Sequence, residues 1–192
     1  NTVNGVNLRS STGNILNNIS VSMNVDRGIW LSIRSASNTL SNIYSNNNKK
    51  GVDLTDSNYN VLSNIIASGN EDEGIYLWNS SNNNINFANS SFNDQGIELL
   101  SSANYNSITN SITYRNAING IYLVFKSHDN IITNLTSFSN PGAGVLLQDA
   151  SNYNVISNVT SVLNGLQGIY IVLSNYTNIT NINASANQNG IF

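Results

Sequence analysis

The chain has 192 residues, a length typical of one domain, and residues 1–192 are interpreted as a single domain. Only 9% of the residues are charged and the net charge is −3, so the basic stripe that nucleic-acid binding needs is missing. The sequence has no cysteine and no apolar run of the ~18 residues that cross a bilayer. Disulfides, cysteine metal sites and membrane insertion of this segment are therefore excluded.

Asparagine takes the place of the missing charged residues, with 41 in the chain. Asparagine is unfavourable in helix interiors and in ordinary strands, so this content indicates either disorder or a repeated turn. Disorder is disfavoured because 40% of the residues are hydrophobic and the aliphatic ones are regularly spaced.

A glycine followed by Ile or Val recurs along the whole chain, with spacings of 23, 23, 23, 22, 24, 24, 24 and 22 residues. Each glycine opens a phrase with apolar residues at +1 and +3 and a variable residue at +2, as in Gly74-Ile-Tyr-Leu. This period of two predicts a strand with one face inward. The recurring glycines are Gly5, Gly28, Gly51, Gly74, Gly96, Gly120, Gly144, Gly168 and Gly190.

Three asparagine columns follow each glycine in order and divide each coil into three predicted short strands. The first column is Asn14, Asn38, Asn60, Asn84, Asn106, Asn130, Asn154 and Asn178. The second, taken as the structural ladder, is Asn18, Asn42, Asn64, Asn89, Asn110, Asn134, Asn158 and Asn181. The third is Asn24, Asn47, Asn70, Asn93, Asn116, Asn140, Asn164 and Asn187.

Such a repeat predicts an all-β, single-stranded parallel β-helix of about eight coils of 22–24 residues. Coils stacked about 4.8 Å apart place equivalent residues above one another, and like amides then bond along the stack. Asn and Gly also tolerate the left-handed backbone that a sharp corner requires.

The phrase Gly-Ile-Tyr-Leu followed by Ser and Asn columns resembles the right-handed parallel β-helix repeat of pectate-lyase-like proteins, the NosD-like periplasmic family and many prokaryotic surface proteins. The resemblance covers essentially the whole chain and implies a right-handed coil, as does the crossover rule for parallel strands. It implies no single activity, because lyases, hydrolases, epimerases and structural proteins share the fold. The Asp and Arg cluster with Ca²⁺ that the family's lyases use matches no positions here, and no cofactor is expected.

The +2 positions point outward and form the richest surface feature, a column that we call the stripe. Its aromatic residues suit sugar rings and are the predicted ligand-binding residues, whereas Asp53 and Glu98, two coils and ~9.6 Å apart, are weak candidates for a catalytic pair. The alternative is that aromatics simply favour an exposed strand. The stripe reads Asn7, Trp30, Asp53, Tyr76, Glu98, Tyr122, Leu146 and Tyr170.

Acidic residues gather in the corners before two of the glycines and are weak candidates for a Ca²⁺ site, since Ca²⁺ takes several oxygen ligands. They are Glu71, Asp72, Glu73 and Asp94. Lys49 and Lys50 in the preceding corner offer them a simpler partner, and no metal site is predicted. The single histidine, His128, is interpreted as a loop residue.

Eight Asn-x-Ser/Thr sequons occur, and half of them fall in the second asparagine column. If those amides face inward they cannot carry glycans, and the better glycosylation candidates are then Asn79, Asn175 and Asn183.

The first functional hypothesis is a non-enzymatic extracellular structural protein of a cell surface, sheath or filament, because the repeat is uninterrupted and its corners are short. Neither end shows a capping element, so we expect a segment of a longer solenoid or a subunit that stacks end to end on copies of itself or on neighbouring surface proteins. The alternatives are a carbohydrate-binding or carbohydrate-active module that binds polysaccharide on the stripe, and an adhesin or phage-tail-like rod.

Overall fold

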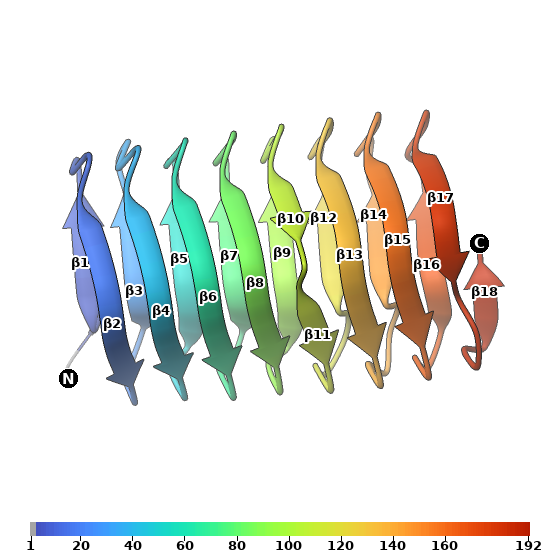
Figure 1. The fold of residues 1–192 in the computed structure, drawn as a ribbon, viewed down its shortest axis with the longest axis horizontal. Coiled ribbons are helices and arrows are strands. Elements are labelled where there is room, and N and C mark those ends of the chain that lie inside the picture. The colour runs from blue at the N-terminus through green and yellow to red at the C-terminus, as the bar shows by residue number, and fades with distance from the viewer. Residues whose placement is uncertain (1–2) are drawn as a thin grey trace.

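The computed structural model describes residues 3–192 as a solenoid in which every strand pairs in parallel with its counterpart in the next coil (Figure 1). Two nine-stranded sheets run along its axis. We call the sheet of the glycine strands sheet A and the other sheet B. Across the described residues, no helix has the length and apolar character needed to span a membrane.

Sheet A contains one short strand from each coil. Its strands are β1 (Val6–Arg9), β3 (Arg27–Ser32), β5 (Lys50–Thr55), β7 (Glu73–Trp78), β9 (Gln95–Leu100), β12 (Ile121–Val124), β14 (Val145–Gln148), β16 (Gln167–Val172) and β18 (Asn189–Ile191). Sheet B is built from longer strands, most of eight residues. They are β2 (Ile15–Ser22), β4 (Thr39–Asn46), β6 (Val61–Ser68), β8 (Asn84–Ser91), β10 (Ser107–Thr109), β11 (Ile112–Tyr114), β13 (Ile131–Phe138), β15 (Val155–Val162) and β17 (Asn178–Asn183).

The core lies between the two sheets and consists of stacked aliphatic side chains. The +1 and +3 residues of sheet A point into it, and Ile75 and Leu77 are typical members with no exposed surface. The predicted inward face is thereby confirmed. The glycines that open the strands are needed because a Cβ on Gly28 would lie 1.9 Å from Ser45 Oγ, inside the same packed interior.

Two of the predicted asparagine columns form buried ladders, in which the backbone N–H of one asparagine, and in most pairs also its Nδ2, donates to Oδ1 of the next. Asn70, for example, donates to Asn93 Oδ1 from its backbone N (2.9 Å) and from Nδ2 (3.0 Å). These bonds satisfy amide groups that a buried corner would otherwise leave unpaired.

Three members of these ladders were predicted one residue away from their true positions. Asn83 stands in the first ladder in place of Asn84, which begins β8, and Asn48 stands in the third in place of Asn47. Asn178 pairs with Val155 inside sheet B, so Thr177 takes the last place in the first column. The corners contain runs of adjacent asparagines, and only the stacking of coils selects which amide turns inward.

The second asparagine column is also a ladder, but it faces outward. Seven of its eight predicted members adopt left-handed backbone conformations (φ 50–57°) within sheet B, so each forms a bulge there and not a corner between two strands. Each coil therefore has two strands where three were predicted, except where sheet B divides into β10 and β11.

Exposed amides bond along this outer ladder, as from Asn134 Nδ2 to Asn110 Oδ1 (3.0 Å). Asn89 is not a member: it pairs with Ile66, and Phe87 occupies the bulge in its coil. The sequon asparagines Asn18, Asn134 and Asn158 are exposed, so the condition that their amides face inward is not met.

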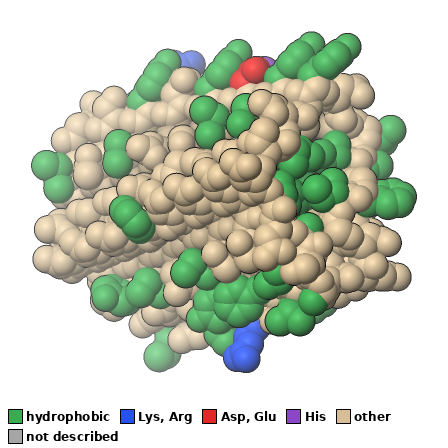
Figure 2. All heavy atoms as spheres, turned by 45° about the vertical axis from the view of Figure 1, so that its right-hand side comes forward, with side chains coloured by type: hydrophobic (Ala, Val, Ile, Leu, Met, Phe, Trp, Pro, Cys, Tyr) green, Lys and Arg blue, Asp and Glu red, His purple; other side chains and the backbone are tan. Residues whose placement is uncertain are grey.

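The segments that join sheet A to sheet B form one edge of the solenoid, at the top of Figure 1, which we call the upper corner. The face of the molecule in Figure 2 is mostly uncharged, with apolar side chains standing out in separate groups.

Candidate functional site: the outer face of sheet A

The predicted stripe is a continuous column on the outer face of sheet A. The register pairs Trp30 with Asp53, Asp53 with Tyr76, Tyr76 with Glu98 and Glu98 with Tyr122. The four aromatic rings lie in every second coil and are half-buried. Rings two coils apart are separated by about 9.6 Å along the axis.

A second column, from the residue just before each glycine, lies on the same face, and we call it the flanking column. Its members beside the stripe are Arg27, Lys50, Glu73, Gln95 and Asn119. Strict alternation would place these residues inward with +1 and +3. The glycine interrupts the alternation, and the side chain before it turns outward beside the stripe.

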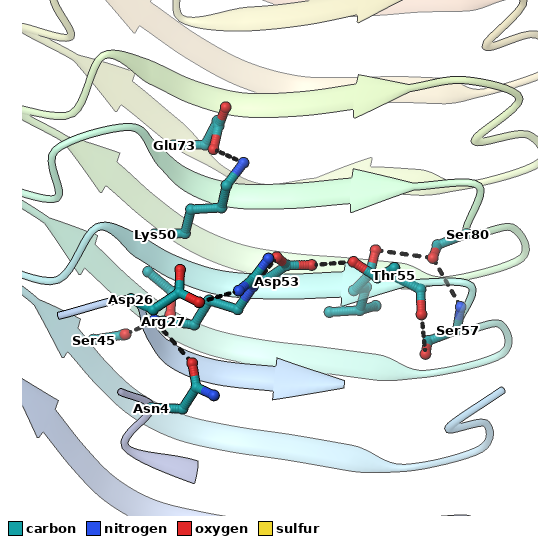
Figure 3. Close-up of polar contacts among 12 residues, drawn as sticks. Asn4, Asp26, Arg27, Ser45, Lys50, Asp53, Thr55, Ser57, Glu73 and Ser80 are labelled. Carbon is teal, nitrogen blue, oxygen red and sulfur yellow. Dashed lines mark hydrogen bonds and ion pairs between the residues drawn. The ribbon is translucent and has the colours of Figure 1, made fainter. Parts of the chain in front are cut away.

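Three flanking residues, Arg27, Lys50 and Glu73, contact the stripe residue of the next coil, and the first contact is an ion pair. Arg27 Nε donates to Asp53 Oδ2 at 2.5 Å, and Thr55 Oγ1 donates to Asp53 Oδ1 at 2.7 Å (Figure 3). Burial raises the pKa of Asp53, and the guanidinium and the hydroxyl oppose that rise. Asp53 is fully buried with both oxygens occupied, so it is positioned as a structural anchor for Arg27 and not as a group open to substrate.

The second contact is a cation over an aromatic ring. Lys50 Nζ lies 3.6 Å from the centroid of the Tyr76 ring and 2.5 Å from Glu73 Oε2. The lysine therefore fixes the ring of the stripe and the flanking carboxylate together. Burial raises the pKa of Tyr76, and the neighbouring Glu98 adds to the rise.

The third contact joins two acids, Glu73 and Glu98. Burial raises the pKa of Glu98 to about 8, and repulsion from Glu73 together with a hydrogen bond to it adds to the rise. A carboxyl group whose pKa is raised above 7 keeps its proton at neutral pH. Glu98 lies between the stripe tyrosines Tyr76 and Tyr122, so in its protonated form it can donate a hydrogen bond on this face.

Beyond Glu98 the face has no further charge in the stripe, which continues as Tyr122, Leu146 and Tyr170. Tyr122 Oη lies 3.4 Å from Gln148 Oε1. At the other end, Arg27 covers the Trp30 ring at 4.5 Å, and the buried Trp30 Nε1 has no hydrogen-bond partner within residues 3–192.

The remaining candidates from the sequence do not gather into one site. Among the described residues, no group of three or more His, Cys, Asp or Glu side chains is arranged to hold a metal ion. Of the four corner acids, Glu73 turns to Lys50 on the sheet A face, while Glu71, Asp72 and Asp94 remain at the corner. The candidates Asn79, Asn175 and Asn183 are all exposed.

The stripe was predicted from the sequence, whereas Lys50 and Glu73 of the flanking column were interpreted as corner residues. Their position directly before each recurring glycine was visible in the sequence. Their orientation was not, since it depends on where the glycine breaks the strand alternation.

The fold and this face define a right-handed parallel β-helix, and residues 1–92 match the family model described as a right handed beta helix region. Residues 89–192 match the model described as periplasmic copper-binding protein (NosD). The chain therefore belongs to the NosD family. No match was found among curated proteins.

Three solved structures share the fold. The periplasmic alginate epimerase AlgG has a TM-score of 0.77, with 15% identity over 94% of this chain and 50% of its own. The mannuronan C-5 epimerase AlgE6 A-module of Azotobacter vinelandii has a TM-score of 0.76, with 16% identity over 100% and 62%. The catalytic domain of a GH87 alpha-1,3-glucanase in complex with tetrasaccharides has a TM-score of 0.65, with 14% identity over 92% and 45%.

The chain thus spans between 45% and 62% of the length of these three structures. At 14–16% identity, the similarity establishes the fold alone.

The residues present do not fit the copper site that the family description implies. Copper is held by imidazole and by soft thiolate or thioether ligands. This chain offers one histidine, one methionine and no cysteine. Met23 follows β2, whereas His128 lies between β12 and β13 with its Nδ1 2.6 Å from Asp129 Oδ2. No copper chemistry is derived for this chain.

Proposed function

We propose that this protein is an exported domain that binds a polysaccharide along the outer face of sheet A. The observation that carries the proposal is the aromatic column at every second coil, formed by Trp30, Tyr76, Tyr122 and Tyr170. A spacing of about 9.6 Å is close to the length of two sugar units in an extended chain, so alternate units can rest on successive rings.

The neighbouring groups suit such a ligand. The Lys50, Glu73 and Glu98 side chains lie beside the rings of Tyr76 and Tyr122 and offer hydrogen bonds to sugar hydroxyls. The rings themselves are half-buried, so their orientation is fixed before a ligand arrives, which lowers the entropic cost of binding.

The relatives support this function over the purely structural role expected first. AlgG and AlgE6 are named as epimerases of alginate and mannuronan, and the glucanase is described with bound tetrasaccharides. Both the family description and AlgG are called periplasmic, which supports export to the periplasm or beyond.

Replacement of a stripe tyrosine by leucine tests the proposal, because Leu146 already occupies the same column and the fold accepts it. Tyr122→Leu is expected to weaken binding to the preferred polysaccharide about fivefold, as one aromatic contact contributes about 1 kcal/mol. Affinity electrophoresis in gels that contain alginate or a neutral glucan measures this change.

Tyr44→Leu is the matched control, since Tyr44 is 49% exposed on sheet B, away from the stripe. Equal binding by wild type and Tyr122→Leu, or an equal loss in Tyr44→Leu, would contradict binding on sheet A.

A further inference from the structure

A cavity of about 490 Å³ lies at the upper corner, away from the stripe. It is lined by Ile33, Arg34, Asp56, Asn58, Asn79 and Ser81, which come from three successive coils between β3 and β8. Its volume lies within the range of about 300–1,000 Å³ that is usual for small-ligand sites.

Hydrogen bonds between the coils fix several polar groups of the cavity. Asn79 Nδ2 donates to Asp56 Oδ1 at 2.6 Å, and the backbone N–H of Ser81 donates to Asn58 Oδ1 at 2.7 Å. These bonds hold the Asp56 carboxylate and the Asn58 amide in place, with the second oxygen of Asp56 and Nδ2 of Asn58 left for a ligand.

Arg34 is the distinctive member of the cavity. Its side chain is exposed, and within residues 3–192 its guanidinium takes part in no ion pair, although Asp56 lines the same cavity. Asp56 is instead bonded to Asn79. A guanidinium presents a planar set of donors that matches a carboxylate.

The cavity also has an apolar wall. Ile33 is 44% exposed and has a left-handed backbone (φ 51°), a conformation that β-branched residues rarely adopt. Tyr59, which directly follows the cavity residue Asn58, is 61% exposed and also left-handed (φ 60°). The corner thus displays apolar side chains at positions where glycine or asparagine would fit with less strain.

We propose that this cavity binds one uronic acid unit of an acidic glycan, independently of the stripe. Its carboxylate pairs with Arg34, its hydroxyl groups donate to Asp56 and accept from Asn58, and its ring lies against Ile33. A cation, a carboxylate, an amide and an apolar surface within one cavity match a sugar acid, whose single charge can face Arg34 while its hydroxyl groups face Asp56. A phosphate ion carries more negative charge and has no sugar ring to pack on Ile33, and an apolar molecule would leave these polar groups unpaired.

Asn79 lines the cavity and is also the acceptor of an Asn-x-Ser sequon. A glycan on Asn79 would occupy the cavity itself, so the protein is prepared in a bacterial host that does not modify this sequon.

The experiment titrates a mannuronate disaccharide into ¹⁵N-labelled protein and follows backbone amide shifts. The largest shifts are expected at the cavity residues, and Arg34→Gln is expected to weaken binding at least tenfold while Arg34→Lys weakens it less. Arg115→Gln is the matched control, because Arg115 is also exposed and in no ion pair of the described chain, and it lies beside Phe92 at another corner.

Unchanged affinity in Arg34→Gln, an equal loss in Arg115→Gln, or no shifts at the cavity would overturn the proposal. Shifts confined to β7, β9 and β12 would overturn it as well, while supporting the separate site on sheet A. Shifts confined to the cavity would support it even if the stripe binds nothing.

Discussion

The buried asparagine ladders and the outer face of sheet A are built by the same stacking of coils but differ in what is stacked. In the ladders, like residues lie above one another, and each amide donates to the next, as from Asn70 to Asn93. On sheet A, unlike residues follow one another, so each contact is different: an ion pair, a cation over a ring, and two acids. Stacked residues of one kind satisfy each other's polar groups. Stacked residues of different kinds leave side chains with a charge, a raised pKa or an exposed ring, and these can contact a ligand.

The largest effect is expected from a break in a buried ladder. Asn93 is 2% exposed, accepts two bonds from Asn70 and donates one to the Ala67 carbonyl at 3.0 Å. Asn93→Ala leaves these buried groups unpaired, at about 1–3 kcal/mol each, so the free energy of unfolding should fall by about 3 kcal/mol or more. Urea denaturation followed by circular dichroism measures the change.

The outer ladder provides the matched control. Asn64 is exposed and donates one bond to Asn42 Oδ1 at 3.2 Å, and Asn64→Gly keeps its left-handed backbone conformation. This variant should lose less than about 0.5 kcal/mol. Equal losses in the two variants would show that burial does not distinguish the ladders.

A smaller change in the free energy of unfolding is expected at Glu73 and Glu98 of sheet A. Here the substitution should stabilise the protein, in contrast to Asn93→Ala. The pKa of Glu98 rises on folding from 4.5 to about 8, so the folded state keeps a proton that the unfolded state has released between these values. Stability should therefore fall as pH rises from 4.5 to about 8, by roughly 2–3 kcal/mol in total once the partial exposure of the pair is allowed for.

Glu98→Gln should remove this pH dependence and be more stable than the wild type at pH 8, with little difference below pH 4.5. Denaturation midpoints at pH 4, 6 and 8 test it. If the free energy of unfolding of the wild-type protein rose with pH between 4.5 and 8, the raised pKa of Glu98 would be ruled out.

The smallest of the three changes in the free energy of unfolding is expected at the ion pair of Arg27 and Asp53. Arg27→Gln leaves the fully buried Asp53 without its cation, and the loss should be about 2 kcal/mol, below the 3–5 kcal/mol of a fully buried pair because Arg27 is partly exposed. The double variant Arg27→Gln/Asp53→Asn should recover most of this loss, as measured by the same denaturation. A double variant no more stable than Arg27→Gln would show that the arginine acts through packing on Trp30.

The solenoid, its coil length, the inward face of sheet A and the alignment of the stripe could all be predicted from the amino-acid sequence. Each of these follows from a period of two within a strand and a period near 23 along the chain, and both periods are visible without a structure. The role expected for the recurring glycines was wrong: none of them has a left-handed backbone, and Gly28 and Gly51, for example, lie inside strands where a Cβ would enter the packed interior.

The contacts between side chains of the irregular segments could not be predicted in this way, because they depend on how neighbouring coils stack. Runs of adjacent asparagines offered two choices for a ladder position, and the neighbouring coil selected Asn48 and Asn83. The outward turn of Arg27 onto Asp53 and the cavity around Arg34 depend on the backbone path at glycines and corners. Such contacts join residues more than twenty positions apart. A shift of one residue in the alignment of two coils changes the partner, and the periodicity within a coil does not predict that alignment.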